Sequence, residues 1–181
     1  MESTAEIDDF LASAHVFANA FQDVVERQLL DQVGGHITAS QIKLLKLVAM
    51  TDGYTLGDVA AFLEVSSPSA SKAVDRMVRQ SLLLRTEDPD DRRLIHLSLT
   101  ILGRRLLNAY EAARIQTLET IFDGFAAEDL QRTAEFLDRI SAGIIDHTEG
   151  LCLNCGAYFR ENCRVRQLAG RKCFYQRHRE E

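Results

Sequence analysis

Cysteine is absent from the first 151 residues of this 181-residue chain, and all four cysteines lie within the last 30 residues. No apolar run approaches the ~18 residues that a membrane-spanning helix needs, so we expect no membrane span. The acidic first residues, MESTAEIDDF, lack the basic-then-apolar pattern of a secretory signal, which favours a cytoplasmic protein. Nucleophile–base sets and phosphate-binding glycine loops are also lacking, so we expect no enzymatic activity.

Basic residues are scarce in most of the chain and gather at its end. The net charge is −6, and residues 1–150 hold 14 Lys and Arg against 24 Asp and Glu, whereas residues 151–181 hold 7 against 3. An acidic protein can still bind DNA through a local basic face, because the distribution of charge matters more than its sum. A chain of this length can bury a core without metal or disulfides, so we expect one domain with a small appendage.

Apolar residues recur at intervals of three and four in several stretches, which predicts a mainly α protein. Long helices are expected over residues 7–30, 39–50, 100–122 and 127–147. Thr38 and Gln41 have the spacing of a capping box at the start of the second helix. The first helix is too apolar to stand alone, so we expect it to pack on its own domain and on a second subunit.

Residues 55–100 have the layout of a winged helix-turn-helix. Thr55 is expected to cap a short helix, and Ser66 to cap the next one, from about Ser67 to Gln80, after a very short connection. A β-hairpin should follow, with strands over residues 82–85 and 94–99 and a charged turn over residues 87–91. A hairpin placed directly after a helix-turn-helix is typical of a winged helix.

The run from Val65 to Gly103 resembles the MarR family of bacterial transcriptional regulators. The resemblance rests on the letters VDRM, on an Asp-Pro-x-Asp-Arg-Arg turn and on Leu-Ser-Leu-Thr-x-x-Gly, in this order and spacing, and it extends over roughly residues 5–147. It implies an obligate homodimer, built by the terminal helices, that binds a pseudo-palindromic DNA operator. Ser81 stands where the family usually has Gly, and it must then take the helix-ending turn that Gly accommodates more easily.

This resemblance, together with the cysteines, divides the chain into four parts. They are an N-terminal dimerisation helix (1–35), a winged helix-turn-helix region (36–100), C-terminal dimerisation helices (101–148) and a cysteine-rich metal-binding tail (149–181), called the cysteine segment below. MarR-like proteins often bind aromatic acids or other small molecules between the DNA-binding part and the dimer helices. No group of polar residues in this sequence indicates which effector would bind.

The helix from Ser67 to Gln80 is expected to enter the major groove of DNA. The residues expected to contact DNA from this helix are Ser67, Ser69, Ser71, Lys72 and Arg76, the last nearer the backbone. In MarR-like proteins the second arginine of the wing motif enters the minor groove and is held by the aspartate two residues before it; here these are Arg93 and Asp91. Arg92 is expected to contact a phosphate. The alternatives are that the serines only cap the helix and that the arginine forms a surface ion pair.

The cysteines, Cys152, Cys155, Cys163 and Cys173, form a C-x2-C-x7-C-x9-C pattern. Four thiolates confined in this way suggest one metal centre, since clustered cysteines in a reducing compartment are more often metal ligands than disulfides. Three interpretations stay open: a disulfide or free thiols, a structural zinc site, and a 4Fe–4S cluster. One C-x-x-C pair followed by two single cysteines favours the cluster slightly, because structural zinc sites often use two such pairs.

Aromatic and basic side chains surround the cysteines in the sequence. Those expected to shelter the centre or to offset its charge are Tyr158, Phe159, Phe174, Tyr175, Arg160, Arg164, Arg166, Arg171 and Lys172, and His147 could replace a cysteine as ligand. A segment ordered by a cluster would follow directly from a dimerisation helix, and could change the spacing of the two recognition helices. Half-sites lie about 34 Å apart, so a small change in spacing alters affinity. We therefore predict a MarR-like regulator controlled by a 4Fe–4S cluster; the alternative is a small-molecule-sensing regulator with a structural zinc site.

Overall fold

The computed structural model describes residues 2–34, 36–50, 54–88, 95–145, 155, 160, 162–170 and 172–174. Its elements, in chain order, are α1 (Glu2–Ala20), the π-helix η1 (Phe21–Glu26), α2 (Arg27–Gln32), α3 (Ala39–Met50), α4 (Leu56–Leu63), α5 (Ser67–Arg79), β1 (Leu83–Glu87), β2 (Ile95–Leu99), α6 (Ile101–Phe122), α7 (Ala127–Ile145) and α8 (Arg164–Ala169). The predicted fold class, mainly helical with a small β-wing, is confirmed. None of the helices described is long and apolar enough to cross a membrane.

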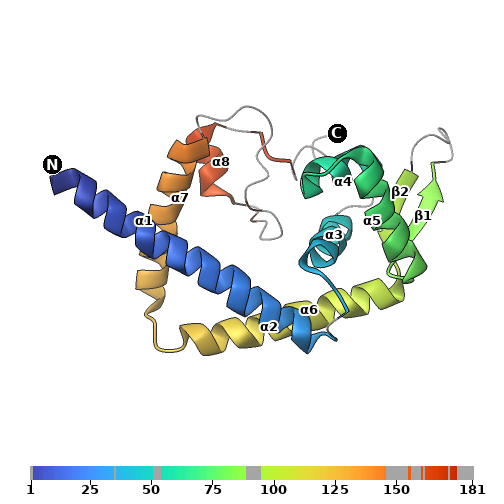
Figure 1. Ribbon diagram of the computed structural model, residues 1–181, viewed down its shortest axis with the longest axis horizontal. Coiled ribbons are helices and arrows are strands. Elements are labelled where there is room, and N and C mark those ends of the chain that lie inside the picture. The colour runs from blue at the N-terminus through green and yellow to red at the C-terminus, as the bar shows by residue number, and fades with distance from the viewer. Residues whose placement is uncertain are drawn as a thin grey trace.

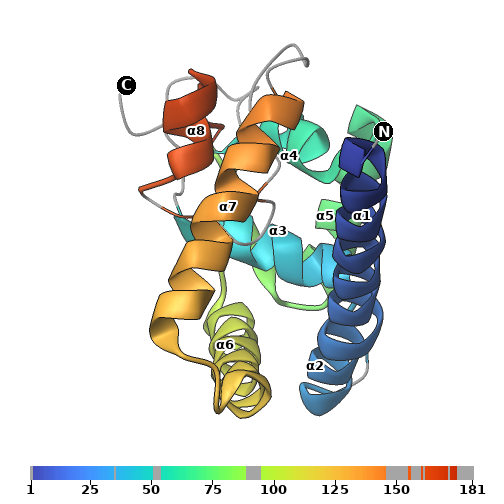
Figure 2. The same ribbon diagram turned by 90° about the vertical axis from the view of Figure 1, so that its left-hand side faces the viewer.

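The helices and strands form two groups joined by α6. Figure 1 shows α3, α4, α5 and the two strands on one side of the molecule, and α7 with α8 on the other. We call the first group, residues 36–100, the winged lobe. Helix α6 leads away from the winged lobe toward α7, and α2 packs on α6. Figure 2 shows α1 and α7 as two separate long helices beside this framework.

The N-terminal helical run is buried at one end only. Val25 and Leu29 are buried in the main core, whereas the α1 half of the run leaves most of its apolar side chains exposed. One contact joins this half to α7, where the rings of Phe10 and Phe136 meet edge to face at 5.8 Å between centroids. The large exposed apolar side chains of α1 and α7 are Ile7, Leu11, Val16, Phe17, Leu130, Phe136, Leu137 and Ile144. The prediction that this run packs on its own domain is confirmed for its C-terminal end.

Local capping signals define the helix starts of the winged lobe. The backbone N–H of Gln41 donates to Thr38 Oγ1 at 3.3 Å, and that of Thr38 donates to Gln41 Oε1 at 2.9 Å, so the predicted capping box is confirmed. Thr55 and Asp58 form a second capping box at the start of α4. Ser66 occupies the N-cap position of α5 as predicted, but it forms no side-chain cap to a backbone N–H, and its Oγ lies 3.0 Å from Ser69 Oγ.

The core of the winged lobe draws on each of its helices and on both strands. Strands β1 and β2 pair antiparallel, from Leu83 opposite Leu99 to Glu87 opposite Ile95. Apart from Ala70, the side chains of the lobe with 0% exposure are Leu45, Leu47, Val59, Val74 and Met77. Burying a side chain of this size contributes about 1.5–3 kcal/mol relative to leaving it in water. This shared core fixes α5 against α4 and the wing.

The turn between α5 and β1 is locked to the start of α6. Ser81 takes the left-handed conformation, with φ of 57°, which confirms the expectation drawn from the missing Gly. Thr100 Oγ1 donates to the Ser81 carbonyl at 2.6 Å and accepts from the Gly103 N–H at 2.9 Å. A Cβ on Gly103 would lie 2.1 Å from the Leu82 carbonyl oxygen, so only glycine allows this approach. The Leu-Ser-Leu-Thr-x-x-Gly run is thus a packing motif that joins the winged lobe to α6.

Candidate nucleic-acid interface and cysteine segment

Helix α5 has one buried face and one exposed polar face. Ala70, Val74 and Met77 are buried at intervals of four and three, which directs the opposite face to solvent. The predicted DNA contacts Ser67, Ser69, Lys72 and Arg76 are all exposed, whereas Ser71 is half-buried. The helix therefore presents small hydroxyls and two cations on the face available to a nucleic acid.

Two side-chain contacts that sequence reasoning missed hold α5 in place. Asp75 accepts from Arg85 Nη1 of β1 at 2.6 Å, which ties the helix to the wing. Gln41 Nε2 donates to Gln80 Oε1 at 2.7 Å, which ties the end of α5 to the start of α3. In each of these two pairs the residues lie on different elements or far apart in the sequence. No rule of sequence spacing therefore predicts the contact. Together they restrict how α5 can tilt relative to the wing.

The wing tip, with the predicted contacts Asp91, Arg92 and Arg93, lies outside the described residues. Its base is described: His96 Nε2 of β2 lies 2.7 Å from Asp88 Oδ2 at the end of β1. This contact joins the two strands just before the tip. The predicted roles of the tip residues stay predictions.

A small cavity of about 150 Å³ lies between α5 and the wing. It is lined by Leu56, Ser71, Arg85, Ile95 and Leu97, and its walls are mainly apolar. Arg85 is already paired with Asp75. Ser71 faces this cavity, which explains why it is less exposed than its neighbours on α5.

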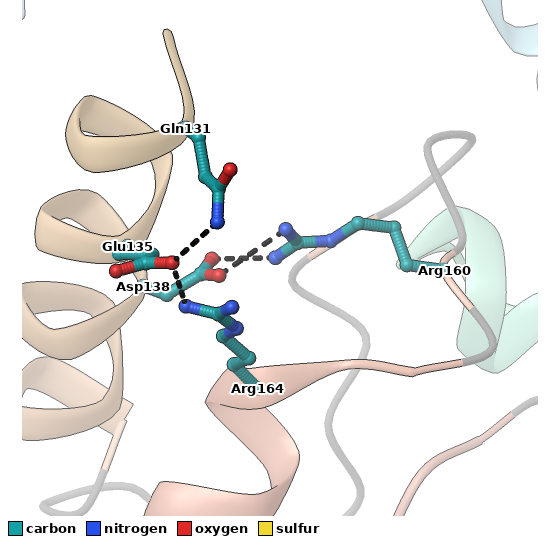
Figure 3. A network of polar contacts seen from close by, with 5 residues as sticks. All are labelled: Gln131, Glu135, Asp138, Arg160 and Arg164. Carbon is teal, nitrogen blue, oxygen red and sulfur yellow. Dashed lines mark hydrogen bonds and ion pairs between the residues drawn. The ribbon is translucent and has the colours of Figure 1, made fainter. Parts of the chain in front are cut away.

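One end of the cysteine segment packs on α7. Val165 of α8 is buried with Ala142 and Ile145 of α7, and Cys163 lies against this cluster. Arg160 Nη2 donates to Asp138 Oδ1 at 2.5 Å and its Nη1 to Oδ2 at 3.2 Å (Figure 3). The Asp138 side chain is only 10% exposed, so this bidentate pair is largely shielded from water.

A second ion pair of the same segment is more exposed. Arg164 Nη1 lies 2.7 Å from Glu135 Oε1, and Gln131 Nε2 also donates to that oxygen, at 3.1 Å (Figure 3). The hydrogen bonds from Arg164 and Gln131 lower the pKa of Glu135. Both side chains of this pair are more than 40% exposed, so solvent screens it.

The other end of the cysteine segment is buried in the winged lobe. Phe174 is 1% exposed and stacks on Tyr54, with 5.5 Å between ring centroids and 4° between planes. It also stacks on Phe62 of α4 at 6.1 Å. Cys173 is buried in the same core. The sequence predicted that Phe174 would shelter a metal centre; the structure places its ring in the core that supports α4, and nothing in the cysteine spacing indicates this.

Three of the four predicted metal ligands are described, and Cys152 lies outside the described residues. Cys155 and Cys173 belong to the core of the winged lobe, and Cys163 lies on the cluster between α7 and α8. The hydrogen bond to Asp138 raises the pKa of Arg160 against the effect of burial, and the nearby Asp138, Cys163 and Cys155 raise it further. Among the His, Cys, Asp and Glu side chains of residues with a described placement, no three are gathered closely enough to hold a metal.

Comparison with known sequences matches the winged lobe to one family. The model of the MarR family matches residues 37–95. The chain is 26% identical over 104 residues to an uncharacterised HTH-type transcriptional regulator of Bacillus subtilis, YsmB, covering 58% of this chain and 70% of that protein. It is 25% identical over 122 residues to the homoprotocatechuate degradative operon repressor of Escherichia coli, covering 67% of this chain and 78% of that protein.

Comparison with solved structures gives the same fold. The crystal structure of Streptococcus pneumoniae FabT in complex with DNA superimposes with a TM-score of 0.64 at 21% sequence identity. The match covers 80% of this chain and 99% of FabT. At this level of identity the likeness establishes the fold, and about a fifth of the present chain has no counterpart in it.

Proposed function

We propose that the chain is a MarR-like winged-helix transcriptional regulator, acting as a homodimer whose binding to an operator is modulated by a 4Fe–4S cluster on Cys152, Cys155, Cys163 and Cys173. Its named relatives are regulators rather than enzymes. The observation that carries the DNA-binding part is the exposed polar face of α5, held by the Asp75–Arg85 and Gln41–Gln80 contacts.

The proposed DNA surface joins this face of α5 to the wing tip. Ser67, Ser69, Lys72 and Arg76 would contact the major groove and its phosphates, and Arg93 the minor groove. Since the whole chain is acidic, binding depends on this local surface and should weaken steeply with salt.

In the proposed dimer, the interface is formed by apolar side chains of α1 and α7 that are exposed in the single chain. Ile7, Leu11 and Phe17 of α1 are each more than half exposed, as is Ile144 of α7. An exposed apolar surface of this extent is typical of an interface between subunits. Sedimentation analysis should therefore give a dimer at micromolar concentration.

The proposed metal centre rests on the donor set and on the position of the thiols. All four donors are cysteines, the ligand type that 4Fe–4S clusters use, and Cys155 and Cys163 lie within electrostatic reach of the Arg160 guanidinium. When bound, a 4Fe–4S cluster would supply a centre whose presence and oxidation state respond to oxidants and to iron supply. The residues of the chain would hold the thiols, and a change in the arrangement of the thiols would be transmitted to the winged lobe.

Metal analysis of anaerobically purified protein tests the cluster directly. We expect brown protein with iron and acid-labile sulfide, and loss of both in Cys163→Ser. Operator affinity of the wild type should change when the cluster is removed. Colourless protein with one zinc and no iron per chain would refute the proposal.

Operator titration at fixed salt tests the wing. Arg93→Ala should weaken binding about tenfold, the usual effect of losing one specific contact. Arg132→Ala, which removes an exposed arginine of α7 on the other side of the molecule, is the charge-matched control and should bind as the wild type does. Equal affinities of the two variants would exclude the proposed role of Arg93.

A second candidate is a regulator that senses a small molecule and holds a structural zinc. The observation favouring it is the similarity to a repressor whose name refers to homoprotocatechuate degradation. Zinc has no redox chemistry, so the cysteine segment would then stabilise the protein without sensing oxidants. The same metal analysis distinguishes the two candidates.

A further inference from the structure

The cysteine segment touches both halves of the molecule, which its position after the last long helix does not require. Arg160, Arg164 and α8 lie against α7, and Phe174 lies in the core of the winged lobe. In Figure 1 α8 lies beside α7, and the short described stretch at residues 172–174 lies near α4. The two attachments are thus about ten residues apart in the chain but on opposite groups of helices.

We propose that the described part of the cysteine segment is a strap that couples α7 to the winged lobe, with Phe174 as the anchor through which the state of the segment reaches the DNA-binding helix. The coupling goes through the winged lobe of the same chain. The sequence alone indicated a different route, through the spacing of the two subunits.

The anchor on the winged lobe is an aromatic stack. Phe174 lies nearly parallel to the Tyr54 ring and faces Phe62 of α4, and all three side chains are buried. Parallel, offset rings of this kind stabilise each other beyond the burial of their area. Withdrawal of Phe174 would leave a cavity beside Tyr54 and Phe62, into which α4 must relax.

Helix α4 in turn positions α5. The two helices pack on each other and are joined by only three residues. The first of these, Glu64, is in the left-handed conformation with φ of 54°, and the Val65 N–H donates to the Ala60 carbonyl at 3.0 Å. This short, hydrogen-bonded connection has little conformational freedom, so a shift of α4 moves the N-terminal end of α5. That end carries Ser67 and Ser69.

The anchor on α7 is the largely buried Asp138 carboxylate, bound by both terminal nitrogens of Arg160. In the sequence, Cys163 lies between the two anchors, and Cys173 directly precedes the anchor residue Phe174. Cys155 lies against the core of the winged lobe. Any rearrangement that gathers these thiols must therefore change the path of the strap. A rearrangement of the cysteines is therefore transmitted to α4, whichever group the cysteines bind.

Hydrogen exchange on the full-length protein tests the strap without reference to metal. In Phe174→Ala, amides of residues 54–63 should exchange about tenfold faster than in the wild type, because the substitution removes the ring that stacks on both Tyr54 and Phe62. Residues 127–145 should exchange at the wild-type rate. Leu168→Ala, which removes a 58% exposed side chain of the same segment, is the control and should leave both regions unchanged. Exchange in Phe174→Ala that matches Leu168→Ala would overturn the strap.

Operator affinity provides the second readout, and this one rests on the proposed function. Phe174→Ala should bind iron as the wild type does, while its operator affinity no longer depends on whether the metal is present. If the wild type lacks iron but residues 54–63 still respond to Phe174→Ala, the strap stands and the cluster is wrong. If the wild type contains iron and Phe174→Ala keeps the full metal response, the cluster stands and the strap is wrong.

A variant at the other anchor covers the case in which Phe174→Ala does not fold. Arg160→Gln breaks the contact with Asp138 and leaves the core of the winged lobe intact. It should reduce the metal dependence of operator affinity and speed exchange in residues 162–170. An unchanged metal response in this folded variant would also count against the strap.

Discussion

The winged lobe and the cysteine segment are stabilised by different kinds of contact. The winged lobe has its own apolar core, two capping boxes and a paired hairpin. The described part of the cysteine segment has one helix of six residues, and it is held by ion pairs and a small apolar cluster on α7 and by the Phe174 ring in the lobe. Most contacts of the lobe are therefore its own, and the segment adds Phe174 and Cys173 to its core, whereas the described part of the segment depends on its partners for its position.

This difference bears directly on regulation. An element with few contacts of its own opens locally at low free energy, and regulatory elements are drawn from such regions. Changes in the winged lobe should therefore act on global stability, and changes in the cysteine segment should act locally. Four tests, ordered by expected effect, examine this contrast.

Gly103→Ala should have the largest effect, because its Cβ would lie 2.1 Å from the Leu82 carbonyl oxygen, in backbone that cannot easily move. We expect a loss of about 3 kcal/mol in the free energy of unfolding, measured with urea. Gly57→Ala in α4 is the control, because its Cβ meets only Thr55 Oγ1 at an ordinary 3.6 Å. This control should stabilise the protein by up to about 1 kcal/mol. Equal stabilities of the two variants would contradict the packing role of Gly103.

Arg160→Ala should have an intermediate and mainly local effect. It leaves the nearly buried Asp138 carboxylate without this partner, but Arg160 itself is 48% exposed. The expected loss is about 1.5 kcal/mol, between that of a surface pair and that of a buried one. Amide hydrogen exchange in residues 162–170 should be faster in Arg160→Ala than in the wild type. Arg164→Ala breaks the more exposed pair with Glu135 and should have a much smaller effect; the reverse order would show that burial of Asp138 does not matter.

Glu111→Gln tests a pair that joins the winged lobe to α6. Burial opposes ionisation of Glu111, but hydrogen bonds from Lys46 at 2.6 Å and Arg114 at 2.7 Å outweigh it and lower its pKa below the ordinary 4.5. A lowered pKa contributes stability above pH 4.5 that is lost as the pH falls through the folded-state value. The wild type should therefore exceed the variant by about 1 kcal/mol at pH 7, with a shrinking difference in acid. Urea unfolding between pH 3.5 and 7 measures this, and a constant difference would contradict it.

The smallest effects concern left-handed turns that the two regions build differently. The winged lobe uses Ser81 with φ of 57°, and the cysteine segment uses Gly170 with φ of 60°. Ser81→Gly should stabilise the protein by about 0.5 kcal/mol, since relief of strain exceeds the entropy lost with glycine. Gly170→Ala should loosen only α8, seen as faster exchange there. A global loss of stability in Gly170→Ala would show that the segment is more than a local element.

Sequence reasoning predicted the winged lobe well because its signals are local. The capping box at Thr38, the cap at Thr55, the helix-turn-helix spacing and the left-handed turn at Ser81 all depend on residues within a few positions of one another. It placed Ser66 at the N-cap of α5 correctly, but the Ser66 hydroxyl pairs with the Ser69 hydroxyl in place of a backbone N–H. It missed Asp75–Arg85 and Gln41–Gln80, because these pairs form only once separate elements are packed.

The sequence by itself determined the order of helices and strands from α3 to α7, the polar face of α5 and the confinement of cysteine to the end of the chain. These follow from periodicity, capping and composition, which act over short distances along the chain. Only the tertiary structure decided where the cysteine segment lies, with Arg160 on the buried Asp138 of α7 and Phe174 between Tyr54 and Phe62. A ring or a charge finds such a partner by shape and desolvation in three dimensions, and the spacing of four cysteines carries no information about that partner.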